Sequence, residues 1–128
     1  MKKRVLVAEN DTRLWEELQT GLKDPEIKDY GTHRVVSSGT VEFYLTRYTE
    51  IAQRLIDEMG FGLYFLDNQL DLLAGGKILS QNALAAAISA RNGGHDMVYN
   101  ISTHENWPYQ KCDKSAPAIL GITGVPNE

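Results

Sequence analysis

The carboxylate at position 67 directly follows a predicted strand, where functional side chains of parallel sheets lie. The apolar run GLYFL, residues 62–66, is typical of a buried strand, and Asp67 follows it directly. Placing a carboxylate at the end of a buried strand is costly unless something uses its charge. Asp67 is therefore the first residue for which we expect a functional role.

Other polar side chains follow two further apolar runs, and a parallel sheet would bring them to the same edge. In chain order these acids, amides and hydroxyls are Glu9, Asn10, Asp11, Ser102 and Thr103. Ligands bind at the carboxyl ends of strands in such sheets. Close carboxylates repel each other, and a hard divalent cation with oxygen ligands relieves this repulsion. Glu9, Asn10 and Asp67 therefore predict a cation site that suits Mg²⁺, although Asp11 also fits a helix cap.

The elements that must position these residues alternate between strands and helices. Apolar and β-branched runs predict five strands, at 4–8, 33–37, 62–66, 97–101 and 118–123. Apolar residues at helical spacing predict helices within 9–22, 40–59 and 77–92. Pro108 and Pro117 leave room for only about two turns of a short fourth helix between the last two strands. This alternation predicts an α/β fold, a doubly wound parallel sheet with helices on both faces.

Length and composition are those of a single globular domain over residues 1–128. The chain has 128 residues, of which 42% are hydrophobic and 23% charged, enough for a core without disulfides or metal. A net charge of −4 disfavours a nucleic-acid backbone as a partner. One cysteine, Cys112, excludes an intramolecular disulfide and fits a reducing cytoplasm. No apolar run approaches the ~18 residues that a membrane span needs.

The arrangement resembles the receiver domain of two-component response regulators, over nearly the whole chain from VLVAEND to GITGVP. In that family an acidic cluster ends the first strand, here END at 9–11, and the phosphoacceptor aspartate ends the third, here Asp67. A glycine opens the third helix eight residues later, as Gly75 does, and Ser102, with Thr103 beside it, matches the Ser or Thr that ends the fourth strand. The resemblance implies a flavodoxin-like, five-stranded sheet of order 2-1-3-4-5.

The resemblance also implies a role for each residue. Asp67 would attack a phosphohistidine or a small phosphodonor as a nucleophile and form an acyl phosphate. Mg²⁺, held by Asp67, the carbonyl of Gln69 and the cluster of Glu9 and Asn10, would neutralise the transferring phosphoryl group. Ser102 would hydrogen-bond the phosphoryl oxygen and report the phosphorylated state. The donor would be a histidine kinase or a phosphotransfer protein, and the chain itself would catalyse no more than phosphotransfer to and from Asp67.

Three features depart from the family's pattern. Asn10 stands where the family has its principal metal-binding carboxylate, and asparagine carries no charge. No lysine follows the predicted fifth strand, where the sequence reads GITGVP, and the nearest substitutes, Lys111 and Lys114, precede that strand. The sequence stops at Glu128, so we expect the fifth helix to be missing and one sheet face near strand 5 to be partly bare. A bare apolar face favours a homodimer or another protein as partner, or indicates a chain cut from something longer.

Three functions stay open on these residues. The leading hypothesis is a stand-alone receiver-like module whose output is protein contact. Asn10 and GITGVP favour a second hypothesis, a pseudo-receiver that is not phosphorylated and acts as a protein interaction module. A third is a small α/β enzyme that uses the acidic site on a phosphorylated substrate, with His104 as acid or base. Mg²⁺ binding separates the first two, and turnover of a phosphate ester without a lasting aspartyl phosphate would indicate the third.

Overall fold

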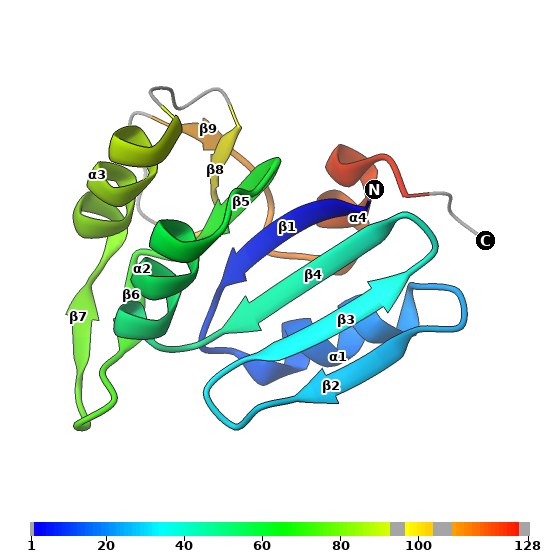
Figure 1. Cartoon of the computed structure of the whole chain (residues 1–128), viewed down its shortest axis with the longest axis horizontal. Helices are drawn as coiled ribbons and strands as arrows, with labels where there is room; N and C mark the ends of the chain where they lie inside the picture. The colour runs from blue at the N-terminus through cyan, green and yellow to red at the C-terminus, as the bar shows by residue number, and fades with distance from the viewer. Residues whose placement is uncertain (1, 93–96, 104–108, 126–128) are drawn as a thin grey trace.

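A seven-stranded sheet, in which most neighbouring strands are parallel, runs through the computed structural model (Figure 1). The structure describes residues 2–92, 97–103 and 109–125. The strands of the sheet are β1 (Lys3–Ala8), β2 (Glu26–Asp29), β3 (Arg34–Ser38), β4 (Val41–Thr46), β5 (Leu63–Leu66), β8 (Val98–Asn100) and β9 (Gln110–Lys111). Their order is β2-β3-β4-β1-β5-β8-β9, with β3 antiparallel to β2 and β4 and the other pairs parallel. A separate hairpin pairs β6 (Gln69–Asp71) with β7 (Lys77–Leu79).

Helices pack on both faces of this sheet. They are α1 (Thr12–Thr20), α2 (Thr49–Glu58), α3 (Gln81–Asn92) and α4 (Ala116–Thr123). α1 and α4 lie together on one face, and α2 and α3 lie together on the other (Figure 1). In β1, Val5 and Val7 belong to the core on the α1 side, while Leu6 and Ala8 belong to the core on the α2 side. All four are fully buried, as expected for a strand covered on both faces.

The broad prediction from the sequence, an α/β fold with a mostly parallel sheet between helices, is confirmed. The strands predicted at 4–8, 62–66 and 97–101 correspond to β1, β5 and β8, and the strand predicted at 33–37 corresponds to β3. β5 pairs with β1 on one side and with β8 on the other. The carboxyl ends of β1, β5 and β8 therefore meet at one edge of the sheet.

The predicted helix at 40–59 is wrong in its first part, because residues 41–46 form β4. Val41, Phe43 and Leu45 are buried and alternate with more polar residues, which is the two-residue period of a strand. Gly39 makes the turn from β3 into β4 with a φ of +57°, a conformation that glycine adopts without strain. Val41 and Leu45 are also four residues apart, so this segment fits the helical period as well and spacing alone could not decide.

The predicted strand at 118–123 is also wrong, because this segment lies in α4. Ser115 caps the helix by accepting a hydrogen bond from the backbone N–H of Ala118, and Pro117 lies in its first turn. Gly124 ends it in the left-handed conformation, with a φ of +75°. α4 packs beside α1 and buries Ile119 in the core, so it covers the sheet face that a missing helix would have left bare. The partner expected at strand 5, a homodimer or another protein, stays a prediction.

The strand count and the order of the whole sheet differ from the predicted five strands in the order 2-1-3-4-5. β2 was not predicted, because its four residues are all exposed and carry no apolar pattern. β9 lies beside β8, where the strand predicted at 118–123 was expected. The helix predicted at 77–92 begins at Gln81, because Lys77–Leu79 pair with β6. Of the short fourth helix, residues 104–108 lie outside the described residues, and β9 occupies part of the remainder.

Phe43 tests the assignment of residues 41–46 to a strand. Its side chain is fully buried in β4, whereas on a helix over 40–59 it would lie off the apolar face. We expect Phe43→Ala to lower the free energy of unfolding by about 3–5 kcal/mol, because the truncation removes apolar contacts and leaves a cavity. Urea unfolding followed by circular dichroism measures this cost. Tyr30→Ala, at a position that is 58% exposed, is the control, and equal costs for the two variants would contradict the assignment.

Candidate functional site

The carboxyl ends of β1, β5 and β8 border a cavity of about 320 Å³ that gathers most of the residues predicted from the sequence. The predicted residues that line it are Asn10, Asp67, Gln69, Ser102 and Thr103, and further lining residues are Asn68, Lys77, Leu79 and Lys114. The backbone N–H of Asp67 donates to the carbonyl of Ala8 at 2.9 Å, which continues the pairing of β1 and β5. This pairing holds the two polar segments side by side.

The ammonium group of Lys114 joins the two carboxylates of the site. Its Nζ lies 2.9 Å from Oε2 of Glu9 and 3.5 Å from Oδ1 of Asp67. The side chain of Glu9 is fully buried and that of Asp67 is 10% exposed, so both carboxylates need a partner of opposite charge. In the sequence Lys114 precedes the predicted last strand. Because β9 is the strand that lies beside β8, Lys114 in fact follows the last strand of the sheet.

Burial and charge act in opposite directions on these groups. Burial raises the pKa of Glu9 above its ordinary value, against the lowering effect of Lys114, and the charge of Asp67 raises it further. Burial by itself lowers the pKa of Lys114, but its contacts with Glu9 and Asp67 outweigh burial and raise it. Lys114 is therefore a cation at neutral pH. When both carboxylates are ionised, the three groups together carry one negative charge.

The two oxygens of Asp67 have different surroundings. Oδ1 accepts a hydrogen bond from the backbone N–H of Asn68 at 2.9 Å and is the oxygen nearest to Lys114. Oδ2 has no hydrogen-bond or ion-pair partner among the residues that the structure describes. One oxygen is thus held in place, while the other is available to a ligand or a reaction in the cavity.

Asn10 anchors the β6–β7 hairpin to the site. Its amide Nδ2 donates to Oδ1 of Asp71 at 3.3 Å, and Nε of Arg47 lies 2.7 Å from the other oxygen of Asp71. The backbone N–H of Asp71 also donates to the carbonyl of Arg47. An aspartate at position 10 would set a carboxylate against Asp71, whereas an amide can donate to it. The asparagine that departs from the family's pattern therefore has a structural reason in this chain.

Ser102 is buried and bonds to residues of β8 and β9, whereas Thr103 is exposed at the rim of the cavity. The backbone N–H and the hydroxyl of Ser102 both donate to Oδ1 of Asn100, at 2.8 and 2.6 Å. The ammonium of Lys111 donates to the carbonyl of Ser102. The two hydroxyls predicted from the sequence therefore differ, because Ser102 is fixed in position and Thr103 faces solvent.

The oxygen atoms in the cavity fit a weakly held Mg²⁺. Asp67, Asn10 and Gln69 line the cavity with carboxylate and amide oxygens, which are hard ligands. Glu9 is less available, since its oxygens already contact Lys114 and the backbone N–H of Asp11. The described part of the chain contains no group of three or more His, Cys, Asp or Glu that could hold a metal. A cation here would therefore keep several waters or bind phosphate oxygens.

Other polar residues considered from the sequence lie elsewhere. Asp11 caps α1, because its Oδ1 accepts a hydrogen bond from the backbone N–H of Arg13 at 3.0 Å. His33 lines a different groove, between α2 and the β2–β4 strands. Cys112 is buried, and burial raises the pKa of its thiol, which disfavours a reactive thiolate. His104, the acid or base of the enzyme hypothesis, lies outside the described residues.

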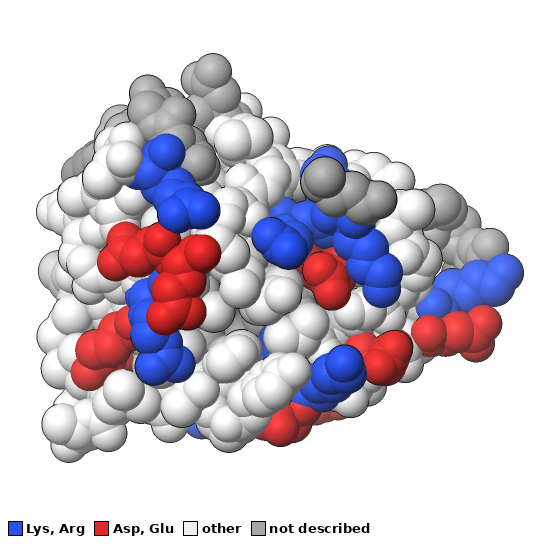
Figure 2. All heavy atoms as spheres, viewed as in Figure 1, with Lys and Arg blue, Asp and Glu red and all other residues white. Residues whose placement is uncertain are grey.

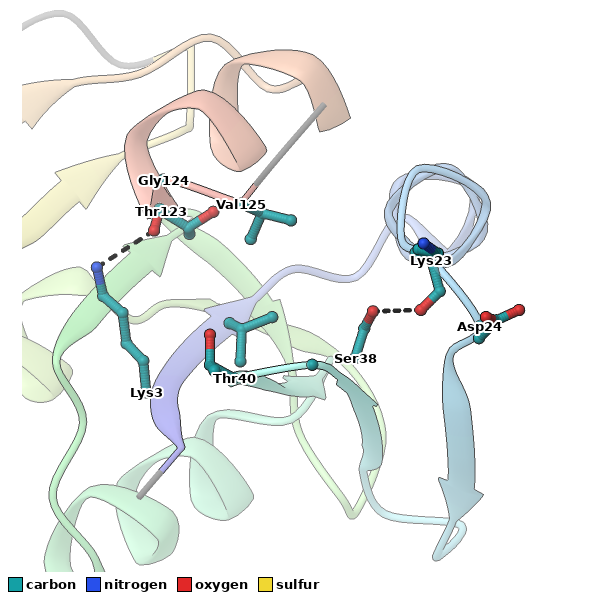
Figure 3. A pocket seen from close by; sticks show the side chains of 10 residues that line it. Lys3, Lys23, Asp24, Ser38, Thr40, Thr123, Gly124 and Val125 are labelled. Carbon is teal, nitrogen blue, oxygen red and sulfur yellow. Dashed lines mark hydrogen bonds between the residues drawn. The ribbon is translucent and has the colours of Figure 1, made fainter. Parts of the chain in front are cut away.

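A larger cavity, of about 460 Å³, lies at the opposite, amino end of β1 and β4 (Figure 3). Its polar groups bond to one another. Nζ of Lys3 donates to the carbonyl of Thr123 at 3.3 Å, and the hydroxyl of Ser38 donates to the carbonyl of Lys23. These contacts join loops and the end of α4. Most of the residues predicted from the sequence line the cavity at the carboxyl end of the strands and not this one.

Charged side chains of both signs are mixed over the face drawn in Figure 2. Several Lys and Arg side chains gather around an acidic side chain near the N-terminus, and charges of both signs alternate elsewhere on this face.

Comparison with known proteins adds little to this geometry. A scan against protein-family models gave no match for this chain, and a search of curated proteins gave none either. A solved structure described as a conserved protein of unknown function, AF0625, is similar at 18% sequence identity and a TM-score of 0.38. The similarity covers 58% of this chain, and this chain spans only 29% of the length of that protein. Among the residues described, no helix is long and apolar enough to cross a membrane.

Lys114→Met tests the charge balance of the site. The variant keeps an apolar side chain of similar length but leaves Glu9 buried without its cation, so we expect it to lose roughly 3 kcal/mol of stability at neutral pH. Burial raises the pKa of Glu9, and loss of Lys114 raises it further. When folding raises the pKa of a carboxyl, the free energy of unfolding falls as the pH rises above the ordinary pKa of that group. The deficit should therefore shrink as the pH falls and Glu9 becomes protonated.

Urea unfolding between about pH 4 and pH 8 measures this dependence. The matched control is Lys28→Met, since Lys28 is exposed and lies 3.7 Å from the exposed Glu26. An exposed ion pair of this kind contributes about 0–1 kcal/mol. A deficit in Lys114→Met that is absent, or equal at all pH values, would contradict the assigned role of Lys114.

Asn10→Asp tests the anchor of the hairpin. A second carboxylate beside Asp71 should lower the free energy of unfolding by about 1–2 kcal/mol at neutral pH and low salt, because like charges repel. Protonation of the introduced aspartate removes the repulsion, so the deficit should shrink as the pH falls toward about 4, the ordinary pKa of an aspartate. Asn10→Ala loses the same hydrogen bond without adding charge, and chemical unfolding compares the two. Parallel stability profiles for the two variants would show that repulsion plays no part.

Proposed function

We propose that this chain is a receiver-like module that accepts a phosphoryl group on Asp67 in two-component phosphorelay signalling and acts through protein contacts. The observation that carries the proposal is the ion cluster in which Lys114 contacts both Glu9 and Asp67. Ser102 and Lys77 also line the cavity beside Asp67. A carboxylate flanked by cations and a hydroxyl donor suits the transfer of a negatively charged phosphoryl group.

The arrangement of the parallel strands supports the same proposal. Numbered among themselves along the chain, the parallel strands β1, β4, β5, β8 and β9 have the spatial order 2-1-3-4-5. β2 and β3 then form an antiparallel addition at the edge, beside the second parallel strand. α4 follows the fifth parallel strand, where the resemblance expects a fifth helix. This order of the parallel strands is compatible with the proposed flavodoxin-like core, to which β2 and β3 would be an addition.

In the proposed reaction, Oδ2 of Asp67 attacks the phosphorus of the donor. A new P–O bond forms to Oδ2, and the bond to the histidine nitrogen of a kinase or phosphotransfer protein, or to the oxygen of a small acyl phosphate, breaks with its electron pair. Lys114 stays beside the aspartate and stabilises the negative charge that the site gains. Mg²⁺, when bound by Asp67, Asn10 and Gln69, supplies further charge neutralisation at the phosphoryl oxygens. The chain performs no catalysis beyond this transfer and its reversal.

One observation favours the alternative, a pseudo-receiver that binds proteins without being phosphorylated. Lys114 already balances the buried carboxylates, so the site is stable without a bound cation or phosphoryl group. Asn10 carries no charge, and its amide nitrogen already donates to Asp71, so Mg²⁺ would have one charged ligand fewer than a carboxylate at this position would give it.

Intact mass after incubation with Mg²⁺ and acetyl phosphate distinguishes the two. We expect the wild-type chain to gain the mass of one phosphoryl group, and Asp67→Asn to gain none because the amide is not a nucleophile. Asp57→Asn, which changes an exposed carboxylate on α2 that does not line the cavity, is the matched control and should be labelled like the wild type.

Each other outcome has a distinct meaning. A wild-type chain that gains no mass and binds no Mg²⁺ would contradict phosphorylation and support the pseudo-receiver. Labelling of Asp67→Asn would show that another residue accepts the phosphoryl group. Release of phosphate from an ester without a lasting adduct would instead support an enzyme that acts on a phosphorylated substrate.

A further inference from the structure

A chain of buried amides lies behind the cavity and connects it to α3. Asn100 at the end of β8 is 2% exposed, and Gln81, the first residue of α3, is fully buried. Nε2 of Gln81 donates to Oδ1 of Asn100 at 2.8 Å and to the carbonyl of Leu66 at 2.9 Å. Oδ1 of Asn100 also accepts from the backbone N–H and the hydroxyl of Ser102. Ser102 faces the cavity on one side and this amide chain on the other.

The neighbouring groups fix how the two amides are turned. The backbone N–H of Ser102 can only donate, so Asn100 must present its oxygen to it. The carbonyl of Leu66 can only accept, so Gln81 must present its nitrogen. The direction of donation, from Ser102 and Gln81 toward Asn100, therefore follows from the backbone and does not depend on the hydroxyl.

Oδ1 of Asn100 has more donors than an amide oxygen has lone pairs. It accepts from Ser102 N, Ser102 Oγ and Gln81 Nε2, whereas a carbonyl oxygen has two lone pairs. The hydroxyl of Ser102 can therefore leave Asn100 without leaving its oxygen unsatisfied. Oε1 of Gln81, in contrast, is buried without a hydrogen-bond partner among the described residues. The network is thus unevenly satisfied, since one amide oxygen has three donors and the other has none among the described residues.

The start of α3 is also bonded to the segment that carries Asp67. The backbone N–H of Ser80 donates to the carbonyl of Asn68 at 2.6 Å, and the hydroxyl of Ser80 donates to the same carbonyl at 3.1 Å. The carbonyl of Ser80 in turn accepts from the N–H of Leu84 in the first turn of the helix. The first turn of α3 is therefore connected to Asp67 through Asn68 and Ser80, and to Ser102 through Asn100 and Gln81.

We propose that Asn100 and Gln81 are positioning residues that couple the Ser102 hydroxyl to the first turn of α3. The inference rests on the proposed phosphorylation of Asp67. When a phosphoryl oxygen accepts the hydroxyl of Ser102, Oδ1 of Asn100 is left with two donors, and its hydrogen bond with Gln81 strengthens. The first turn of α3 becomes more stable. Phosphorylation is thereby reported on the α2–α3 face of the molecule, where the two helices pack together.

Amide hydrogen exchange, measured with and without Mg²⁺ and acetyl phosphate and at equal levels of adduct, tests the coupling. In the wild type, phosphorylation should slow exchange at residues 82–85 at least about threefold, because local opening becomes less frequent. Gln81→Met has a similar length but no donor, and should lose this response. Ser102→Ala should lose it too, whereas Ser102→Thr keeps a hydroxyl and should retain it.

The matched control is Thr49→Val in α2. Thr49 is buried and its hydroxyl has no hydrogen-bond partner among the described residues, so its removal leaves the amide chain intact. This variant should respond like the wild type. An adduct without slower exchange in the wild type, or an unchanged response in both Gln81→Met and Ser102→Ala, would overturn the coupling while leaving phosphorylation in place. A wild-type chain without an adduct would overturn the proposed function, and the coupling with it.

Discussion

The ammonium of Lys114 between Glu9 and Asp67 is the interaction on which the site depends. β1 is the central strand, and its end carries a fully buried carboxylate that would be unstable without a cation. That cation comes from the loop after β9, so a strand of two residues determines where the positive charge lies. The loop ends at α4, and the packing of α4 beside α1 fixes that end of the loop. The carboxyl end of the sheet and the C-terminal segments therefore stabilise each other.

The sequence allowed the middle of the fold and the polar ends of its strands to be predicted. β1 and β5 are continuous apolar runs that stop at Glu9 and Asp67, and this contrast is visible without a structure. Residues 41–46 and 118–123 were misassigned for a physical reason. Each contains apolar residues whose spacing fits both a strand and a helix, and only the neighbours select one. The signals that resolve the second case, Ser115 and Pro117 before the segment and Gly124 after it, are local helix-end residues.

The acids, amides and hydroxyls of the candidate site could be predicted from the sequence, whereas its lysines could not. Lys77 and Lys114 line the cavity, yet the elements that bring them there are the short strands β7 and β9. Strands of two or three residues leave no periodic pattern in a sequence. Asn10 is similar, because its amide is explained by Asp71, which lies 61 positions along the chain. Such pairings depend on topology and become visible only when the chain is folded.

The central place of β1 has a consequence for the order in which the molecule is built. Val5, Leu6, Val7 and Ala8 are apolar toward both faces, and their strand neighbours are β4 and β5. During synthesis this segment emerges before both of these neighbours, and β5 is complete only after Leu66 has been added. Pairing over such sequence distances is slow, and an unpaired apolar strand is prone to aggregation while it waits. β1 thus completes its hydrogen bonds late, although it is synthesised before either of its strand neighbours.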